Sequence, residues 1–249
     1  MGIFIYQVAE HLEDTTPGLS PLGDLYEMGP AGRWIRGIFQ KTTENTGIKV
    51  FYGRSSKLRT TMAATPEQWM RAKKEQLAHR YLSQGGYLLL SSWFRTTSGR
   101  LLALVSQTPA VGSAWVPIQS TSLSLDEAKA ICAYFNSTLG MLFFLNRRSG
   151  TLSNPQFSMA HLCSLPVPNF GSLDSSHLMQ AFESTKNQTI HPWKLAEKYP
   201  VREDLDRAYA KSLNIDLNKI RNLRSIISKE PTVSNQPAPC EVEVLQEAA

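Results

Sequence analysis

The chain has 249 residues, of which 42% are hydrophobic and 19% charged, and a formal net charge of +5. A chain of this length and balance can bury a substantial core, which excludes a low-complexity or wholly disordered protein. No apolar run approaches the roughly 20 residues that cross a bilayer. The first residues also lack the basic start and cleavage site of a secretory signal. We therefore expect a cytoplasmic protein that makes no membrane contact.

The net charge hides a strong asymmetry along the chain. Residues 1–28 carry five acidic side chains and no Lys or Arg. Residues 29–100 carry thirteen Lys and Arg against three Glu, a net charge of +10. Such a basic block indicates a surface that faces a polyanion, although a merely solvated basic face would have the same composition.

The cysteines and histidines do not indicate a metal site. Cys132 lies on the apolar face of a predicted helix, where a packing role fits a free thiol. His161 and Cys163 are two residues apart, but no CxxC pair accompanies them and the other histidines show no ligand spacing. We expect no bound metal.

The first predicted elements in chain order are two basic strands. Residues 34–39 and 48–52 have the aromatic and β-branched residues of strands, and the polar segment 40–47 could close a hairpin between them. The basic side chains of this region can neutralise phosphates. Its aromatic rings can either support the sheet or stack on a base.

A helix and a hairpin follow. Thr65 and Pro66 are typical of a helix start, and the helix is expected to run to about Leu82 with a basic face. Residues 87–94 and 100–106 predict two strands joined by a short turn. Residues 111–116 predict one more strand, which ends before a proline because proline cannot continue a central ladder.

The second half of the chain is predicted to be mainly helical. Ser124 and Glu127 form a capping box, and apolar residues then recur at helical spacing as far as Phe143. After residue 168, further helices are expected at 174–186, 201–213 and 217–227. Residues 231–249 have no periodicity, so we expect a disordered tail.

These elements predict an α/β (α+β) fold with a mixed or antiparallel sheet and packed helices. We expect residues 1–170 to form the main domain. Residues 171–230 would form a small helical appendage, and residues 231–249 the tail.

Several short motifs carry a family resemblance. The most specific is Ala133–Gly140, AYFNSTLG, and it is preceded by Gly29-Pro30 and Trp115-Val116-Pro117 and followed by Leu165–Pro168. In their order and spacing, these motifs resemble the target-recognition domain of adenine-specific DNA methyltransferases and of restriction-modification specificity proteins. The resemblance covers most of residues 25–232.

The resemblance implies a target-recognition-domain-like α/β fold that docks on double-stranded DNA beside a catalytic partner. Arginine can bind guanine and asparagine can bind adenine through two hydrogen bonds. The candidate DNA-binding residues lie in the basic hairpin region around residues 33–59, at the end of the central helix and in the loop that follows it: Arg33, Arg36, Lys41, Lys49, Arg54, Lys57, Arg59, Asn146, Arg147, Arg148 and Asn154. For Arg147 and Arg148 a second interpretation stays open, since exposed arginines also stabilise the negative end of a helix.

An enzymatic alternative rests on residues 153–157, SNPQF. This segment is similar to the N/D/S-P-P-aromatic motif with which amino-methyltransferases hold a flipped base, but Gln156 replaces the second proline. The glycine-rich turn that would hold S-adenosylmethionine is missing, because Gly85-Gly86 precedes a predicted strand and does not follow one. We expect no catalytic activity and no cofactor in this chain, with S-adenosylmethionine present only through a partner.

The leading hypothesis is therefore a non-catalytic DNA-recognition subunit, or a fragment of one, in a prokaryotic restriction-modification or antiphage defence complex. A methyltransferase, nuclease or helicase chain would be the partner. The alternative is a scaffold or adaptor subunit that keeps the fold but contacts protein or guide-paired nucleic acid. An RNA-binding protein ranks last, because the chain lacks the motifs of common RNA modules.

Overall fold

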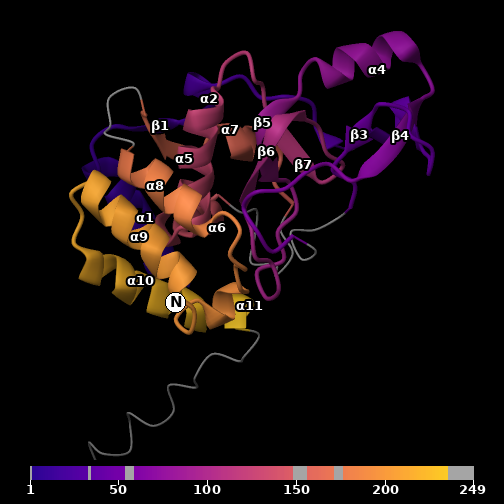
Figure 1. Ribbon diagram of the computed structural model, residues 1–249. Coiled ribbons are helices and arrows are strands. Elements are labelled where there is room, and N and C mark those ends of the chain that lie inside the picture. The colour runs from indigo at the N-terminus through magenta and orange to yellow at the C-terminus, as the bar shows by residue number, and fades with distance from the viewer. Residues whose placement is uncertain (1, 33–34, 54–58, 148–155, 171–175, 235–249) are drawn as a thin grey trace, which may run out of the picture.

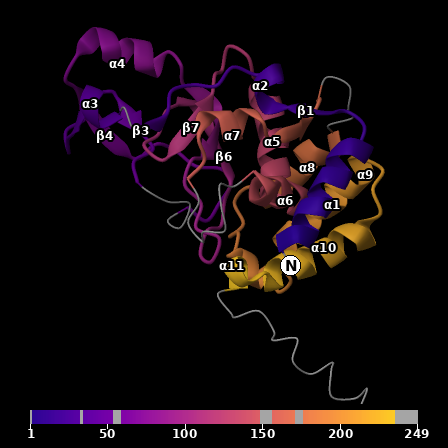
Figure 2. The same cartoon turned by 180° about the vertical axis from the view of Figure 1, so that it is seen from behind.

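The structure is a computed structural model that describes residues 2–32, 35–53, 59–147, 156–170 and 176–234. It has the mixed α+β fold that the sequence predicts, with antiparallel sheets covered by helices. Figures 1 and 2 show α4 (Glu75–Leu82) at one end of the molecule. The helices α9 (Pro200–Ser212) and α10 (Leu217–Lys229) lie at the other end in both views.

The central sheet forms around the hairpin that the sequence predicts. β5 (Gly86–Ser91) pairs antiparallel with β6 (Ala103–Ala110), and on its other edge with β7 (Trp115–Ile118). The connection between β5 and β6 spans residues 92–102 and is longer than the predicted turn. All but one of the β5 residues are buried, because helices and loops cover both faces of the sheet.

Strand β7 begins later than predicted and includes a proline. It lies at an edge of the sheet, where Pro117 costs no ladder hydrogen bond. The Pro117 carbonyl accepts a hydrogen bond from the backbone N–H of Gly29 at 2.7 Å. A Cβ on Gly86 would lie 1.6 Å from the Ile118 carbonyl oxygen, so the pairing of β5 with β7 requires glycine there.

The central helix is broken, which corrects the single long helix expected from its periodicity. α5 (Leu125–Asn136) begins at the predicted Ser124–Glu127 capping box, but it ends at Ser137, where α6 (Thr138–Asn146) starts at an angle of 73°. Ser137 is extended, and its hydroxyl donates to the Tyr134 carbonyl and caps α6 by accepting from the Gly140 N–H. At the bend, Ser137 ends the first helix and caps the second.

None of the described helices is by itself long and apolar enough to cross a membrane. The bent pair of α5 and α6 meets the length and composition criterion only when the two helices are taken together. Residues 130–145 of this pair are all buried inside the protein.

The small sheet of three strands differs from its prediction. Residues 35–38 form a short helix, α3 (Ile35–Ile38), and β2 (Phe39–Lys41) starts only after it. The helix expected over residues 65–82 is split into β4 (Gln68–Ala72) and α4. β4 lies between β2 and β3 (Lys49–Val50), so the predicted hairpin of two basic strands does not form.

Burial explains this rearrangement. Met70 in β4 is buried together with Phe39 and Val50 of the neighbouring strands, beneath Ala78 and Tyr81 of α4. Met70 reaches this core from the middle strand of the small sheet. Tertiary packing therefore outweighs the helix propensity of residues 68–72.

The N-terminal segment packs against later parts of the chain. α1 (Gly2–Thr15) is followed by β1 (Leu19–Pro21), which pairs antiparallel with β8 (Pro166–Pro168). Two short helices, α2 (Leu22–Leu25) and α7 (Met159–Cys163), flank this pair. The pairing brings residues 19–21 beside the predicted closing segment of the domain.

The three predicted C-terminal helices are confirmed as α8 (Ser176–Thr185), α9 and α10. They pack on the central helices, since the Tyr209 ring meets the Tyr134 ring edge-on at 5.2 Å and its hydroxyl donates to the Ala130 carbonyl at 2.8 Å. The predicted disorder from residue 231 is wrong for its first residues, which form α11 (Pro231–Ser234) with Val233 fully buried. Residues 235–249 lie outside the described residues.

Candidate nucleic-acid interface

The small sheet, α3 and α4 form a separate packing unit, which we call the basic lobe (residues 35–50 and 68–82). Its core is a second hydrophobic cluster, distinct from the main core around β5 and α5. The Phe39 and Tyr81 rings meet edge-on at 5.9 Å and join the sheet to α4. Figures 1 and 2 show this unit projecting from the rest of the molecule.

The surface of the basic lobe is strongly cationic. It carries seven Lys and Arg against two Glu, a net charge of +5, and all seven cations are exposed. The seven are Arg36, Lys41, Lys49, Arg71, Lys73, Lys74 and Arg80. Of these, Arg71 forms an ion pair with Glu44 on the surface. A cluster of exposed cations at one end of a protein attracts polyanions over several ångströms of solution.

Aromatic rings hold two of these lysines. The Lys41 ammonium lies 3.8 Å from the Tyr52 ring centroid, and the Lys49 ammonium lies 4.2 Å from the Trp69 ring centroid. Contacts of this kind contribute about 0.5–1 kcal/mol at exposed sites and reduce the freedom of long side chains. The two rings therefore position the lysine charges. Because each ring face is covered by an ammonium group, that ring face is not open for stacking on a base.

The structure brings together only part of the predicted DNA-binding set. Arg36, Lys41 and Lys49 belong to the basic lobe. Arg59 lies beside it, with its guanidinium over the Phe51 ring and paired with Glu67. The remaining residues of this predicted strand region, Arg33, Arg54 and Lys57, lie outside the described residues.

The second predicted segment, at the end of α6, is engaged differently. Arg147 donates two hydrogen bonds to the Glu13 carboxylate of α1, at 2.6 and 2.7 Å, and a third to the Ser164 carbonyl at 3.3 Å. The Asn146 amide is buried, and within the described part of the chain its atoms have no hydrogen-bond partner. Arg148 and Asn154 lie outside the described residues.

Four cations of the basic lobe were absent from the predicted set: Arg71, Lys73, Lys74 and Arg80. The sequence showed these four side chains as the basic face of the helix that we expected over residues 65–82. The split into β4 and α4 separates them, because it places Arg71 on the sheet and Arg80 on the helix. No local pattern could assign them to these two surfaces.

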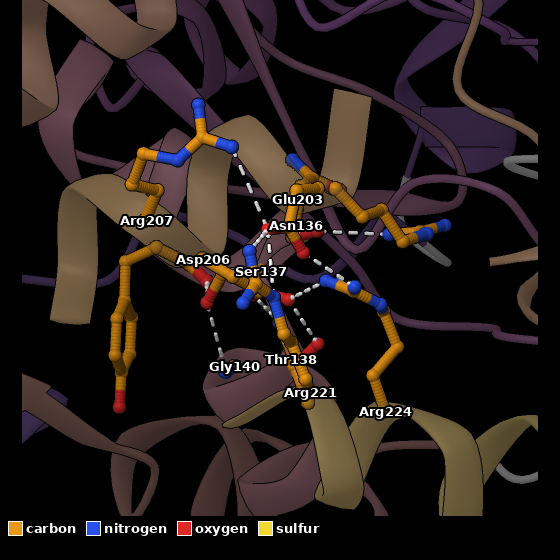
Figure 3. A network of polar contacts seen from close by, with 11 residues as sticks. Asn136, Ser137, Thr138, Gly140, Glu203, Asp206, Arg207, Arg221 and Arg224 are labelled. Carbon is orange, nitrogen blue, oxygen red and sulfur yellow. Dashed lines mark hydrogen bonds and ion pairs between the residues drawn. The ribbon is translucent and has the colours of Figure 1, made fainter. Parts of the chain in front are cut away.

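The AYFNSTLG motif, on which the resemblance mainly rests, is buried and has a structural role. Asp206 of α9 is fully buried and accepts hydrogen bonds from the backbone N–H and the hydroxyl of Thr138, both at 2.7 Å. Arg224 of α10 donates to the same carboxylate at 2.5 Å. Figure 3 shows this network at the bend between α5 and α6. Burial raises the pKa of Asp206, while these donors favour its charged form.

A second buried cation completes the network. Arg202 donates to the carbonyls of Asn136, Arg100 and His191 at 2.8–2.9 Å, and its guanidinium stacks 3.6 Å from the ring of Trp193 in the 3₁₀ helix η2 (Trp193–Leu195). Burial lowers the pKa of Arg202 to about 9, so it stays charged at neutral pH. Its bonds satisfy carbonyls that the helix break and the loops leave open, which is a structural role.

The segment similar to a methyltransferase motif also contributes to the core. Phe157 is buried, and its ring meets Phe144 of α6 edge-on at 4.6 Å. Its backbone N–H donates to the Ser92 carbonyl at 3.0 Å, next to the bridge between Gln156 and Trp93. The ring is therefore not presented to solvent for stacking on a base. Residues 153–155 lie outside the described residues.

Within the described residues, no group of three or more His, Cys, Asp or Glu side chains is placed to hold a metal ion. His161 instead closes a capping box with Ser158 at the start of α7. Cys132 is buried in the core, and burial raises the pKa of its thiol.

Comparison with known proteins places the fold. No family model matches the sequence, and neither does any curated protein. Among solved structures, part of the type IIG restriction endonuclease BpuSI resembles the chain, with a TM-score of 0.61 and 10% sequence identity. The likeness covers 93% of this chain and 32% of the endonuclease chain, so the chain spans about a third of that enzyme's length. At this identity the two chains are alike in fold.

Proposed function

We propose that this chain is a DNA-recognition unit of a restriction-modification or antiphage defence complex, and that it binds double-stranded DNA. The main support is that nearly the whole chain shares its fold with part of a type IIG restriction endonuclease. The target-recognition motifs of the sequence support the same assignment from an independent direction.

The charge distribution supports duplex DNA as the ligand. The basic lobe presents seven exposed cations, which lie on α3, on the three strands, on α4 and on the turn between β4 and α4. A Lys or Arg side chain can neutralise a backbone phosphate. Phosphate contacts fix the position of a protein on DNA, and the base sequence is then read by other side chains in the grooves. Side chains in the loops next to the basic lobe would contact the bases.

We further propose that a partner performs the covalent chemistry. The Phe157 ring is packed against Phe144, and the buried charges of α9 and α10 are used in the core. A methyltransferase, nuclease or helicase, on another chain or in another part of a longer protein, would supply the reaction and any S-adenosylmethionine.

The test is duplex binding by fluorescence anisotropy between 50 and about 300 mM salt, with a parallel methylation assay. The expected result is binding that weakens steeply with salt and no methyl transfer by the purified chain. Methylation or cleavage by the chain alone would overturn the proposal, and so would an absence of duplex binding at low salt.

The alternative of a scaffold or adaptor subunit predicts a different result. Such a chain would assemble with its protein partners at unchanged affinity after the cations of the basic lobe are replaced by glutamine. Co-purification with a methyltransferase, nuclease or helicase that survives these replacements, without any DNA binding, would favour it.

A further inference from the structure

The three strands of the basic lobe have two distinct faces. Residues directly opposite each other in an antiparallel pair point to the same face, and successive residues point to opposite faces. Gln40 lies opposite Arg71, and Lys49 lies opposite Trp69. Arg71 and Trp69 are two residues apart on β4, so all four side chains share one face, which we call the outer sheet face.

The other face of this sheet is closed. Phe39, Val50 and Met70 alternate with the residues of the outer sheet face and are buried. α4 covers them through Ala78 and Tyr81. Lys41 lies opposite Met70, so it shares this covered face and is exposed at its edge. The uncovered face of the sheet is the outer sheet face, where Gln40, Lys49 and Arg71 are exposed.

Resting on the proposed function, we infer that the outer sheet face is the surface that grips the sugar–phosphate backbone of double-stranded DNA. Lys49 and Arg71 are diagonal neighbours on adjacent strands, and such positions are about 7–8 Å apart. Phosphates follow one another at roughly 3.4 Å of axial rise on each DNA strand, so the two cations can each contact a separate phosphate.

Trp69 orders this surface. Its ring is half-buried on the outer sheet face and holds the Lys49 ammonium 4.2 Å from its centroid. A lysine that is already held in place loses less side-chain entropy when it binds a phosphate. Trp69 thus acts as a positioning residue for Lys49.

Glu44 opposes the interaction. In the free protein its carboxylate pairs with the Arg71 guanidinium, and both side chains are more than half exposed. A phosphate that approaches Arg71 must displace this carboxylate, and the two negative charges also repel each other. Replacing Glu44 with glutamine should therefore strengthen duplex binding while leaving the fold intact.

The test compares two double variants that remove the same charge from opposite faces of the lobe. K49Q/R71Q alters the outer sheet face, and K74Q/R80Q alters the α4 side. We expect K49Q/R71Q to weaken binding of a mixed-sequence duplex about tenfold and to lower the salt slope by about 2. We expect K74Q/R80Q to weaken binding by less than about threefold and E44Q to strengthen it.

The role of Trp69 has its own readout. Trp69→Leu keeps an apolar side chain but removes the ring beneath Lys49, so affinity should fall a few-fold while the salt slope is unchanged. Circular dichroism and urea unfolding confirm that each variant is folded. If W69L instead lowers the salt slope, as K49Q/R71Q is expected to do, or leaves affinity unchanged, Trp69 does not position Lys49.

The outcomes separate this inference from the proposed function. If the wild-type chain binds duplex DNA but K49Q/R71Q has no greater effect than K74Q/R80Q, the assignment of the outer sheet face as the DNA-binding surface is wrong and the proposed function stands. If the wild-type chain binds no duplex, both proposals fail. Tighter binding of single-stranded DNA or double-stranded RNA than of the matched DNA duplex would overturn the choice of ligand.

Discussion

The Asp206 carboxylate accepts two hydrogen bonds from Thr138, one from its backbone N–H and one from its hydroxyl, each at 2.7 Å. This contact joins α9 to the first residue of α6, across 68 positions of the sequence. It satisfies an N–H that the helix break leaves without an intrahelical partner.

Removing this carboxylate should destabilise the protein strongly. Asp206→Ala leaves the buried Arg224 with one carboxylate partner fewer and the Thr138 donors unsatisfied, which typically costs about 3–5 kcal/mol of unfolding free energy. Urea unfolding measures this loss. Arg207→Gln is the matched control on the same helix, since that side chain is exposed, and it should change stability by less than about 0.5 kcal/mol.

Gly140 should tolerate no side chain. Gly→Ala in a helix normally stabilises by about 0.5–1 kcal/mol. Here a Cβ would lie 2.4 Å from the Tyr134 carbonyl oxygen and 2.5 Å from the Phe135 Cα, so Gly140→Ala should destabilise by about 1–3 kcal/mol. Gly37→Ala, where no heavy atom lies within 4 Å, is the control. A stabilising effect of Gly140→Ala would contradict the observed bend.

Stability should fall in acid through Glu203. Hydrogen bonds from Arg221, and then from Arg224, lower the pKa of Glu203 from 4.5 to about 2. Because the folded value lies below the unfolded one, the stabilisation is complete above about pH 4.5 and is lost as the pH falls towards 2. The stability difference between wild type and Glu203→Gln, from urea midpoints at several pH values, should shrink over this range. A difference that stays constant with pH would exclude this role.

The Arg147–Glu13 pair should act in stability more than in DNA binding. One terminal nitrogen of the guanidinium donates to both oxygens of the Glu13 carboxylate, and its Nε donates to the Ser164 carbonyl. Arg147→Gln should therefore lower the unfolding free energy by about 1 kcal/mol and leave duplex affinity within about twofold. If Arg147 instead contacts DNA, Glu13→Gln will raise duplex affinity and Arg147→Gln will lower it well beyond twofold.

The predicted boundary at residue 170 can be tested by truncation. Leu205 and Tyr209 of α9 are fully buried in the same hydrophobic cluster as α5. Arg202 donates from α9 to the Asn136 and Arg100 carbonyls. A chain that ends at residue 170 should therefore lose cooperative thermal unfolding, as measured by circular dichroism. If it unfolds cooperatively, residues 1–170 form an independent domain as predicted.

Part of the candidate site could be predicted from the sequence. The excess of Lys and Arg in the basic lobe is visible in the sequence composition, and Lys41 and Lys49 were in the predicted set. Their arrangement was not predicted, because β4 enters the sheet between β2 and β3 and places Arg71 on the same face as Lys49. Which face a strand residue occupies depends on its pairing partners, and these are distant in the sequence.

The sequence by itself determined the elements that depend on local periodicity and capping. These include the Ser124–Glu127 capping box, the β5–β6 hairpin and the helices α8 to α10, since each is stabilised by neighbours along the chain. Only the tertiary structure decided the strand β4 and the bend at Ser137. Burial of Met70 and the contact between Thr138 and Asp206 outweigh local helix propensity there, and both form between segments that only the folded chain brings together.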